Sequence, residues 1–124
     1  MRAWRVNTTR QKYGAKPKFI DGIRFASTKE AQRYSELKLL VLANEITHLE
    51  LQPRFDLWAA APIKDGMRNI IFVGVYKADF KYRDQRNSGV TVIEDVKSSV
   101  TSTEAYRLRK RIAEACHGIT IREV

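Results

Sequence analysis

Three charged residues in the second half of the chain have the types and spacing needed to hydrolyse a phosphodiester bond. Asp79 lies near the end of the apolar segment 69–80, and Asp95 follows the β-branched segment 90–93. Both segments predict strands, and the polar cluster 84–89 between them predicts a turn. A hairpin centred on this turn would place Asp79 opposite Asp95. Two facing carboxylates destabilise a sheet unless a hard cation with oxygen ligands binds them.

Lys97 adds a positive charge beside this predicted acid pair. It is two residues from Asp95 on one predicted strand, so both side chains project from the same face. Two carboxylates, a metal ion and a lysine can activate a water molecule and stabilise a pentavalent phosphate. The alternative for so short a motif is an ordinary surface ion pair. The hairpin register and the apolar flanks favour the catalytic interpretation.

Glu30 is a third candidate acid. Ser27 and Glu30 have the spacing of a capping box, which predicts that a helix begins here and runs over about 28–43. Glu30 extends the core-facing stripe of this helix, whereas Glu36 falls on the opposite, solvated face. The alternative is that Glu30 only completes the capping box, although the two roles are compatible.

The order of these four residues resembles the PD-(D/E)xK endonuclease superfamily. Over roughly residues 13–124 the chain is more closely similar to a small phage and prophage family of Holliday-junction-resolvase-like proteins, a domain-of-unknown-function group. The spacing to Lys97 selects Asp95 over its neighbour Glu94, which should point to the other face. The segments that carry the closer likeness are 12–16, 21–25, 27–31, 49–53, 78–80 and 94–97.

The resemblance implies a role for each motif residue. Asp79, Asp95 and the backbone carbonyl of Val96 would ligate Mg²⁺, for which Mn²⁺ could substitute. Glu30 would hold a water molecule on that metal or a second metal, and Lys97 would orient or help deprotonate the attacking water. Gln52 matches a recurring position and is a possible accessory residue, although a surface role is equally compatible with the sequence.

The same resemblance implies a Mg²⁺-dependent endodeoxyribonuclease that is structure-selective for branched DNA, in phage or prophage recombination or replication. Paired incision of a symmetric junction would require two active sites, and hence a homodimer. Two other interpretations stay open: a non-catalytic nucleic-acid-binding protein on a nuclease-like scaffold, and a basic protein-interaction module.

The charge of the chain favours a DNA partner. Its 124 residues carry 23 Lys and Arg against 14 Asp and Glu, a net charge of +9. A basic excess of this size is typical of phosphate-binding surfaces, although a solvated basic surface is the alternative. The candidate DNA-binding residues are Arg2, Arg5, Arg10, Lys12, Lys16 and Lys18 near the N-terminus, and Arg107, Lys110 and Arg111 on a predicted second helix.

Length and composition predict one small domain, residues 13–124, preceded by a basic arm over 1–12. A single cysteine excludes an intramolecular disulfide and favours the cytoplasm, that of the host cell if a phage encodes the chain. No apolar run reaches the roughly 20 residues that span a bilayer, so no membrane contact is expected.

The pattern of elements predicts an α/β fold with a restriction-endonuclease-like αβββαβ core, whose mixed central sheet is flanked by helices. The first helix is followed by strands over 48–57, 69–80 and 90–97. A helix over about 102–115, ended by Gly118, then leads to a short strand over 119–124. Pro53 predicts an edge position or a local bulge in the first of these strands.

Overall fold

The computed structural model describes residues 17–63, 66, 69–97 and 103–124. Two short strands, β1 (Lys18–Ile20) and β2 (Ile23–Phe25), form a hairpin before helix α1 (Thr28–Leu42). Asp21 and Gly22 join them with φ of 54° and 75°, as a tight two-residue hairpin turn requires. The Tyr34 hydroxyl donates to Asp21 Oδ2 at 3.0 Å and so ties the turn to α1. The predicted arm over 1–12 lies outside the described residues.

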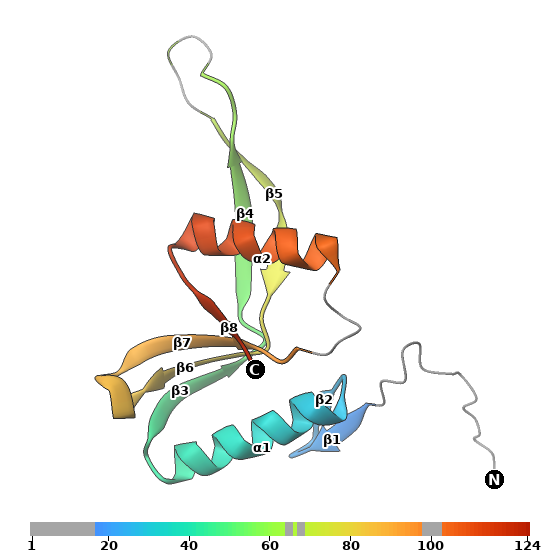
Figure 1. Cartoon of the computed structure of the whole chain (residues 1–124), viewed down its shortest axis with the longest axis vertical. Coiled ribbons are helices and arrows are strands. Elements are labelled where there is room, and N and C mark those ends of the chain that lie inside the picture. The colour runs from blue at the N-terminus through green and yellow to red at the C-terminus, as the bar shows by residue number, and fades with distance from the viewer. Residues whose placement is uncertain (1–16, 64–65, 67–68, 98–102) are drawn as a thin grey trace, which may run out of the picture.

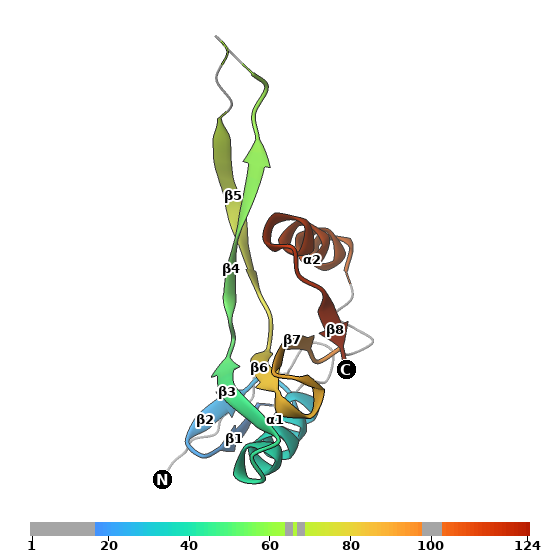
Figure 2. The ribbon, with the colours of Figure 1, turned by 90° about the vertical axis from the view of Figure 1, so that its left-hand side faces the viewer.

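A long antiparallel ribbon rises from the body of the molecule (Figure 2). In its lower part β3 (Ile46–Leu51) pairs with β6 (Phe80–Asp84), and in its upper part β4 (Arg54–Ala60) pairs with β5 (Ile70–Lys77). The sequence predicted single strands over 48–57 and 69–80, and both predictions were wrong in this respect, because each segment is divided between two strands.

The physical cause of the first break is local. Gln52 has a left-handed φ of 51°, and Pro53 has no N–H to donate, so regular pairing ends there. Opposite this break, Ala78 and Asp79 interrupt the second strand. Backbone hydrogen bonds still cross the ribbon, from Gln52 N to Asp79 O at 2.9 Å and from Ala78 N to Pro53 O at 3.1 Å. The kink therefore bends the ribbon without separating its strands.

The central sheet is mixed, with the strand order β3-β6-β7-β8. β7 (Val90–Asp95) pairs antiparallel with β6 and parallel with β8 (Ile121–Glu123). A short 3₁₀ helix, η2 (Gln85–Asn87), turns the chain from β6 into β7, and α2 (Glu104–His117) connects β7 to β8. Gly118 ends α2 with a φ of 63°, as expected. The predicted mixed α/β fold is confirmed, although α2 begins and ends two residues later than expected and the last strand is shorter.

Two apolar cores lie on opposite sides of the sheet, one beneath α1 and one beneath α2 (Figure 1). β7 contributes to both, because Val92 belongs to the α1 core and Ile93 to the α2 core. The next two residues continue the alternation, since Glu94 contacts Arg33 on α1 and Asp95 contacts Tyr106 on α2. Every side chain from Val92 to Asp95 is buried for this reason. In the part of the chain that the structure describes, no helix is both long and apolar enough to cross a membrane.

The predicted hairpin register is confirmed. Phe80 pairs with Glu94, so the next pair outward is Asp79 and Asp95. Asp79 lies one residue before β6, and its amide donates to Glu94 O at 3.0 Å. The prediction that Lys97 shares a strand with Asp95 was wrong, because β7 ends at Asp95. The amide of Lys97 instead donates to Val124 O at 2.9 Å, which holds this segment beside the C-terminal strand.

Candidate active site

The candidate residues meet where the ribbon is kinked. The breaks in both ribbon strands, the end of β7 and the N-terminus of α1 converge on this point. A pocket of about 200 Å³ opens there, and Glu30, Gln52 and Asp79 line it together with Arg24 and Phe25 of the first hairpin. Gln52 thus lies beside two of the predicted catalytic acids.

Glu30 is placed by the start of α1. The side chain of Ser27 caps the helix by accepting a hydrogen bond from the Glu30 amide at 3.1 Å, as the capping-box pattern predicts. The Glu30 side chain is only 8% exposed. Burial, together with the nearby charge and hydrogen bond of Asp79, raises the pKa of Glu30 to about 7. At neutral pH this carboxyl group is therefore poised between its two protonation states.

Asp79 is held by the backbone at the end of β7. Its Oδ2 accepts a hydrogen bond from the Val96 amide at 2.7 Å. Burial raises the pKa of Asp79, while the hydrogen bonds from Val96 and Glu30 act in the opposite direction. Val96 therefore contacts the site through its N–H group, whereas the sequence predicted a role for its carbonyl oxygen.

Asp95 is anchored by two tyrosines. Its Oδ2 accepts hydrogen bonds from the Tyr76 hydroxyl and, at 2.9 Å, from the Tyr106 hydroxyl. Burial raises the pKa of Asp95 to about 6, although the hydrogen bond from Tyr106 and the charge of Lys110 lower it. Asp95 also lies close enough to Glu30 for its charge to raise the pKa of Glu30. The three acids therefore form one electrostatic group.

Lys97 is linked to Asp95 through an acid that the sequence analysis did not select. Lys97 Nζ lies 3.1 Å from Glu123 Oε1. Glu123 Oε2 lies 3.4 Å from the same Tyr106 hydroxyl that binds Asp95, and 3.1 Å from Lys110 Nζ. Both lysines lower the pKa of Glu123 through hydrogen bonds. Lys97 and Asp95 thus belong to one network on the α2 side, as their spacing predicts.

Glu94 has a different environment from Asp95. It is fully buried and forms two hydrogen bonds with Arg33, at 2.9 Å from Nε and 2.7 Å from Nη2. The Tyr82 hydroxyl adds a third bond at 2.5 Å. These contacts explain how a buried carboxylate is tolerated. The Glu94 side chain therefore lies on the α1 side of the sheet, on the face opposite to Asp95, as the sequence predicts.

The donor chemistry of the site fits a hard divalent cation. Carboxylate oxygens are the preferred protein ligands of Mg²⁺, and the raised pKa values of Glu30, Asp79 and Asp95 reflect burial that a bound cation would offset. Among the described residues, however, no three His, Cys, Asp or Glu side chains are already arranged to hold one metal ion. Metal binding would therefore require the acid side chains to turn.

The predicted DNA-binding residues fall into three sets. Lys18 is exposed on β1, and Arg107 and Arg111 are exposed on α2. Lys110 is turned toward Glu123. The remaining predicted set, Arg2, Arg5, Arg10, Lys12 and Lys16, lies outside the described residues.

Sequence reasoning missed four contributors to the site and its support: Arg33, Tyr76, Tyr106 and Glu123. Tyr106 and Glu123 come from α2 and β8, and no local motif marks them. Glu123 reaches the site because β8 pairs in parallel with β7, with Glu123 in register with Asp95, and this pairing is visible only in the fold.

One comparison with known proteins identifies the family. The family model described as a protein of unknown function, DUF1064, matches residues 10–119. The chain belongs to DUF1064. No curated protein and no solved structure matches this DUF1064 chain. The matched range includes Glu30, Asp79, Asp95 and Lys97.

Proposed function

We propose that this DUF1064 protein is a metal-dependent endonuclease that hydrolyses phosphodiester bonds in DNA, with a preference for branched structures. One observation supports the proposal most directly: Glu30, Asp79 and Asp95 come from three separate segments, yet form a single group of acids with raised pKa values, in which Glu30 and Asp95 are buried and Asp79 is half-buried. Perturbed acids clustered at a pocket are typical of functional sites. The resemblance of their order to the PD-(D/E)xK superfamily supports the same reaction.

The proposed site would bind Mg²⁺ through Asp79 and Asp95, with Glu30 as a further ligand or water-mediated contact. The ion, when bound, would neutralise negative charge that develops on the phosphate. Glu30, which lies close to Asp79 at the pocket, would hold the attacking water in place. Tyr106 would hold Asp95 in position through its hydrogen bond to Oδ2.

Lys97 would contribute a positive charge to the phosphate. Its ammonium group now pairs with Glu123, and that contact holds Lys97 on the Asp95 side of the site. With a side chain 39% exposed, Lys97 can also reach a ligand at the surface. The pairing with Glu123 would position the lysine before substrate binds.

DNA as substrate is supported by the overall charge of +9. Preference for branched DNA rests on the family resemblance and on the size of the chain, which leaves little material for base-reading elements. Selectivity would then depend on DNA shape and phosphate positions.

A second candidate function is non-catalytic DNA binding on the same scaffold. It is favoured by the hydrogen bonds that already engage Asp79 and Asp95, and by the ion pair between Lys97 and Glu123. In that case the acid group would be a structural remnant, and Mg²⁺ would change neither DNA cleavage nor protein stability.

The test is incubation of the purified protein with labelled linear, nicked, flapped and four-way DNA, with and without Mg²⁺. The proposal expects Mg²⁺-dependent cleavage, fastest on the four-way junction. Asp79→Asn and Asp95→Asn should each abolish cleavage while retaining DNA binding. Asp56→Asn is the matched control, because Asp56 pairs with the exposed Arg54 away from the acid group. Cleavage by both site variants at the wild-type rate would falsify the assignment.

A further inference from the structure

The upper part of the ribbon carries the largest exposed apolar surface among the described residues. Six large apolar side chains on or beside β4 and β5 are between 43% and 65% exposed: Trp58, Ile63, Ile70, Ile71, Phe72 and Val73. Trp58 and Phe72 contact each other edge to face, with ring centroids 5.5 Å apart. We name this surface, formed by residues 58–63 and 70–73, the apolar arm. It projects beyond α2 in both views of the molecule (Figures 1 and 2).

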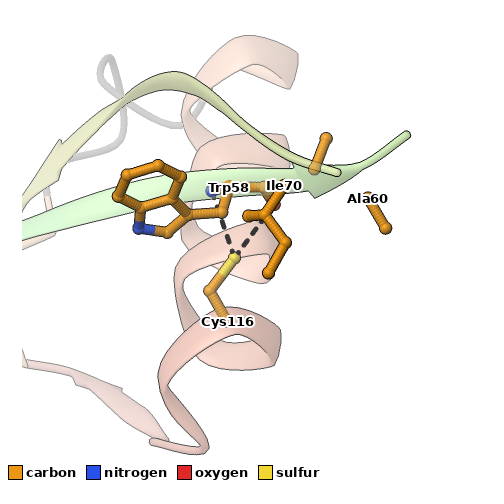
Figure 3. A pocket seen from close by; sticks show the side chains of 5 residues that line it. Trp58, Ala60, Ile70 and Cys116 are labelled. Carbon is orange, nitrogen blue, oxygen red and sulfur yellow. Dashed lines mark hydrogen bonds between the residues drawn. The ribbon is translucent and has the colours of Figure 1, made fainter. Parts of the chain in front are cut away.

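A groove at the base of the apolar arm shows that the surface is shaped as well as exposed. The groove has a volume of about 580 Å³ and is lined by Trp58, Ala59, Ala60 and Ile70 from the ribbon and by Cys116 from α2. Figure 3 shows Trp58 and Ile70 on the ribbon above Cys116, whose Sγ accepts a hydrogen bond from Trp58 N at 3.4 Å and donates one to Trp58 O at 3.3 Å. These bonds fix the end of α2 against β4, so the groove is preformed.

The outer edges of the two strands in the arm have no partner strand among the described residues. β4 and β5 pair only with each other among the described strands. Natural proteins protect exposed sheet edges with charged residues, proline or short strands. β5 instead presents Ile70, Ile71, Phe72 and Val73 in succession, with no charge among them. An edge of this kind is a template for another strand, and a two-stranded ribbon is only marginally stable without one.

The absence of charge in the described part of the apolar arm indicates which kind of partner would bind it. The described segments 57–63 and 69–76 contain no charged residue, although the whole chain carries a net charge of +9. An uncharged apolar surface would add little to the affinity for DNA, because contacts with phosphate groups dominate DNA binding. A second copy of the chain would be repelled by most of the basic surface but not by this part. An uncharged strand edge is also self-complementary, as a two-fold interface requires.

The exposed apolar side chains of the arm add to what the paired strand edges would bury. A large apolar side chain that is about half exposed offers roughly 100 Å². The six side chains of the arm therefore offer about 600 Å² per copy, which is at the upper end of the apolar patches found on monomers. Pairing through the β5 edges covers only part of this area, because residues 70 and 72 lie on one face of the ribbon and residues 71 and 73 on the other. Backbone hydrogen bonds between the paired edges supply the rest of the interface.

We propose that the apolar arm is a dimerisation element in which β5 of one copy pairs antiparallel with β5 of a second copy. The two ribbons join into a four-stranded sheet, in which the β5 side chains of the two copies lie beside one another on both faces. The two-fold axis passes between the paired β5 strands near residues 70–73. This assembly does not depend on the proposed nuclease activity.

The first test measures molar mass in solution by light scattering coupled to size-exclusion chromatography at moderate salt. The wild-type chain should elute at twice its mass of 14.3 kDa. Ile71→Lys and Phe72→Lys should each raise the dimer dissociation constant at least about 10-fold, because each removes apolar contact and brings two like charges close together across the paired β5 strands. Leu39→Lys is the matched control: Leu39 is 67% exposed, but it lies on α1 away from the arm, and the variant should remain dimeric.

The second test locates the two-fold axis. Single cysteines at residues 70, 71, 72 and 73, each in a Cys116→Ser background, are oxidised at low protein concentration. Antiparallel β5 pairing predicts a disulfide-linked dimer at one dominant position, because only pairs at the axis bring the two Cα atoms within bonding range. Monomeric wild-type protein at about 100 μM would overturn the proposal. Dimers that persist with an unchanged dissociation constant in both lysine variants, or that form no cross-link at any of the four positions, would also overturn it.

Discussion

Replacing Glu30 with glutamine should stabilise the metal-free protein at alkaline pH. Glu30 has an ordinary pKa of 4.5 and a pKa of about 7 in the folded protein, because burial and the charge of Asp79 disfavour its ionised form. Between these two values the folded state holds a proton that the unfolded state has released. The free energy of unfolding of the wild-type protein should therefore decrease as the pH rises from about 4.5 to 7 and remain low above 7. Glutamine, which is neutral and nearly isosteric, removes this loss.

The size of this stabilisation follows from the pKa shift of Glu30. At about 1.4 kcal/mol per pH unit, the full difference corresponds to about 3 kcal/mol. Glu30 lines a pocket that opens to solvent, and water there screens the interaction, so we expect a gain of about 1.5–2 kcal/mol at pH 8. For a domain of this size the gain should raise Tm by about 5–8 °C. At pH 4.5 the two proteins should differ by less than about 0.5 kcal/mol.

Thermal or urea unfolding with EDTA, at pH 4.5 and pH 8, measures the effect. Glu36→Gln is the control, because Glu36 lies on the same helix with an exposed side chain; its effect should be small at both values. With Mg²⁺ present, the stability advantage of Glu30→Gln over the wild type should disappear or reverse, since the cation stabilises the wild-type protein by mass action and stabilises the variant less. A variant that is no more stable than the wild type at pH 8 would refute the reasoning that burial and the charge of Asp79 disfavour ionised Glu30.

Three further predictions concern other parts of the molecule. Glu94→Gln should lower the free energy of unfolding in urea by about 3 kcal/mol, because it leaves the Arg33 guanidinium without its buried charged partner. Glu36→Gln removes only the exposed partner of the same arginine and should lower it by less than about 0.5 kcal/mol. Tyr106→Phe should raise the pKa of Asp95 above about 6, because it removes a hydrogen bond that lowers it, and an unchanged carboxyl titration by NMR would contradict this. Deletion of residues 1–12 should weaken binding to all DNA forms. The slope of log binding constant against log salt concentration should decrease by about 0.9 for each DNA phosphate that the shortened protein no longer binds. An unchanged slope would mean that this segment does not touch DNA.

The parts of the fold that could be predicted from the sequence are those set by local chemistry. Ser27 and Glu30 marked the start of α1, Gly118 marked the end of α2, and the polar cluster 84–89 set the hairpin register that brings Asp79 opposite Asp95. Each of these signals lies within a few residues of its effect. Local signals of this kind do not depend on distant parts of the chain.

The kink was predicted only in part, as an irregularity at Pro53, and the network around Lys97 could not be predicted from local signals. Glutamine is not a residue that typically adopts a left-handed conformation, so nothing in the sequence indicated the positive φ of Gln52. The contacts of Glu123 with Lys97 and Tyr106 join segments that are brought together only by the parallel pairing of β7 with β8. Such long-range placement depends on topology and not on residue spacing.

The position of the acid group between two apolar cores has a consequence for folding cooperativity. Phe80, directly after Asp79, belongs to the α1 core, whereas Tyr76, which binds Asp95, belongs to the α2 core. Repulsion among the acids therefore acts at the boundary between two units that could open separately. Amide hydrogen exchange of the metal-free protein should show two levels of protection, one for each core. A cation held by acids from both sides would couple the units, so that the two protection levels converge and the protein opens as a whole.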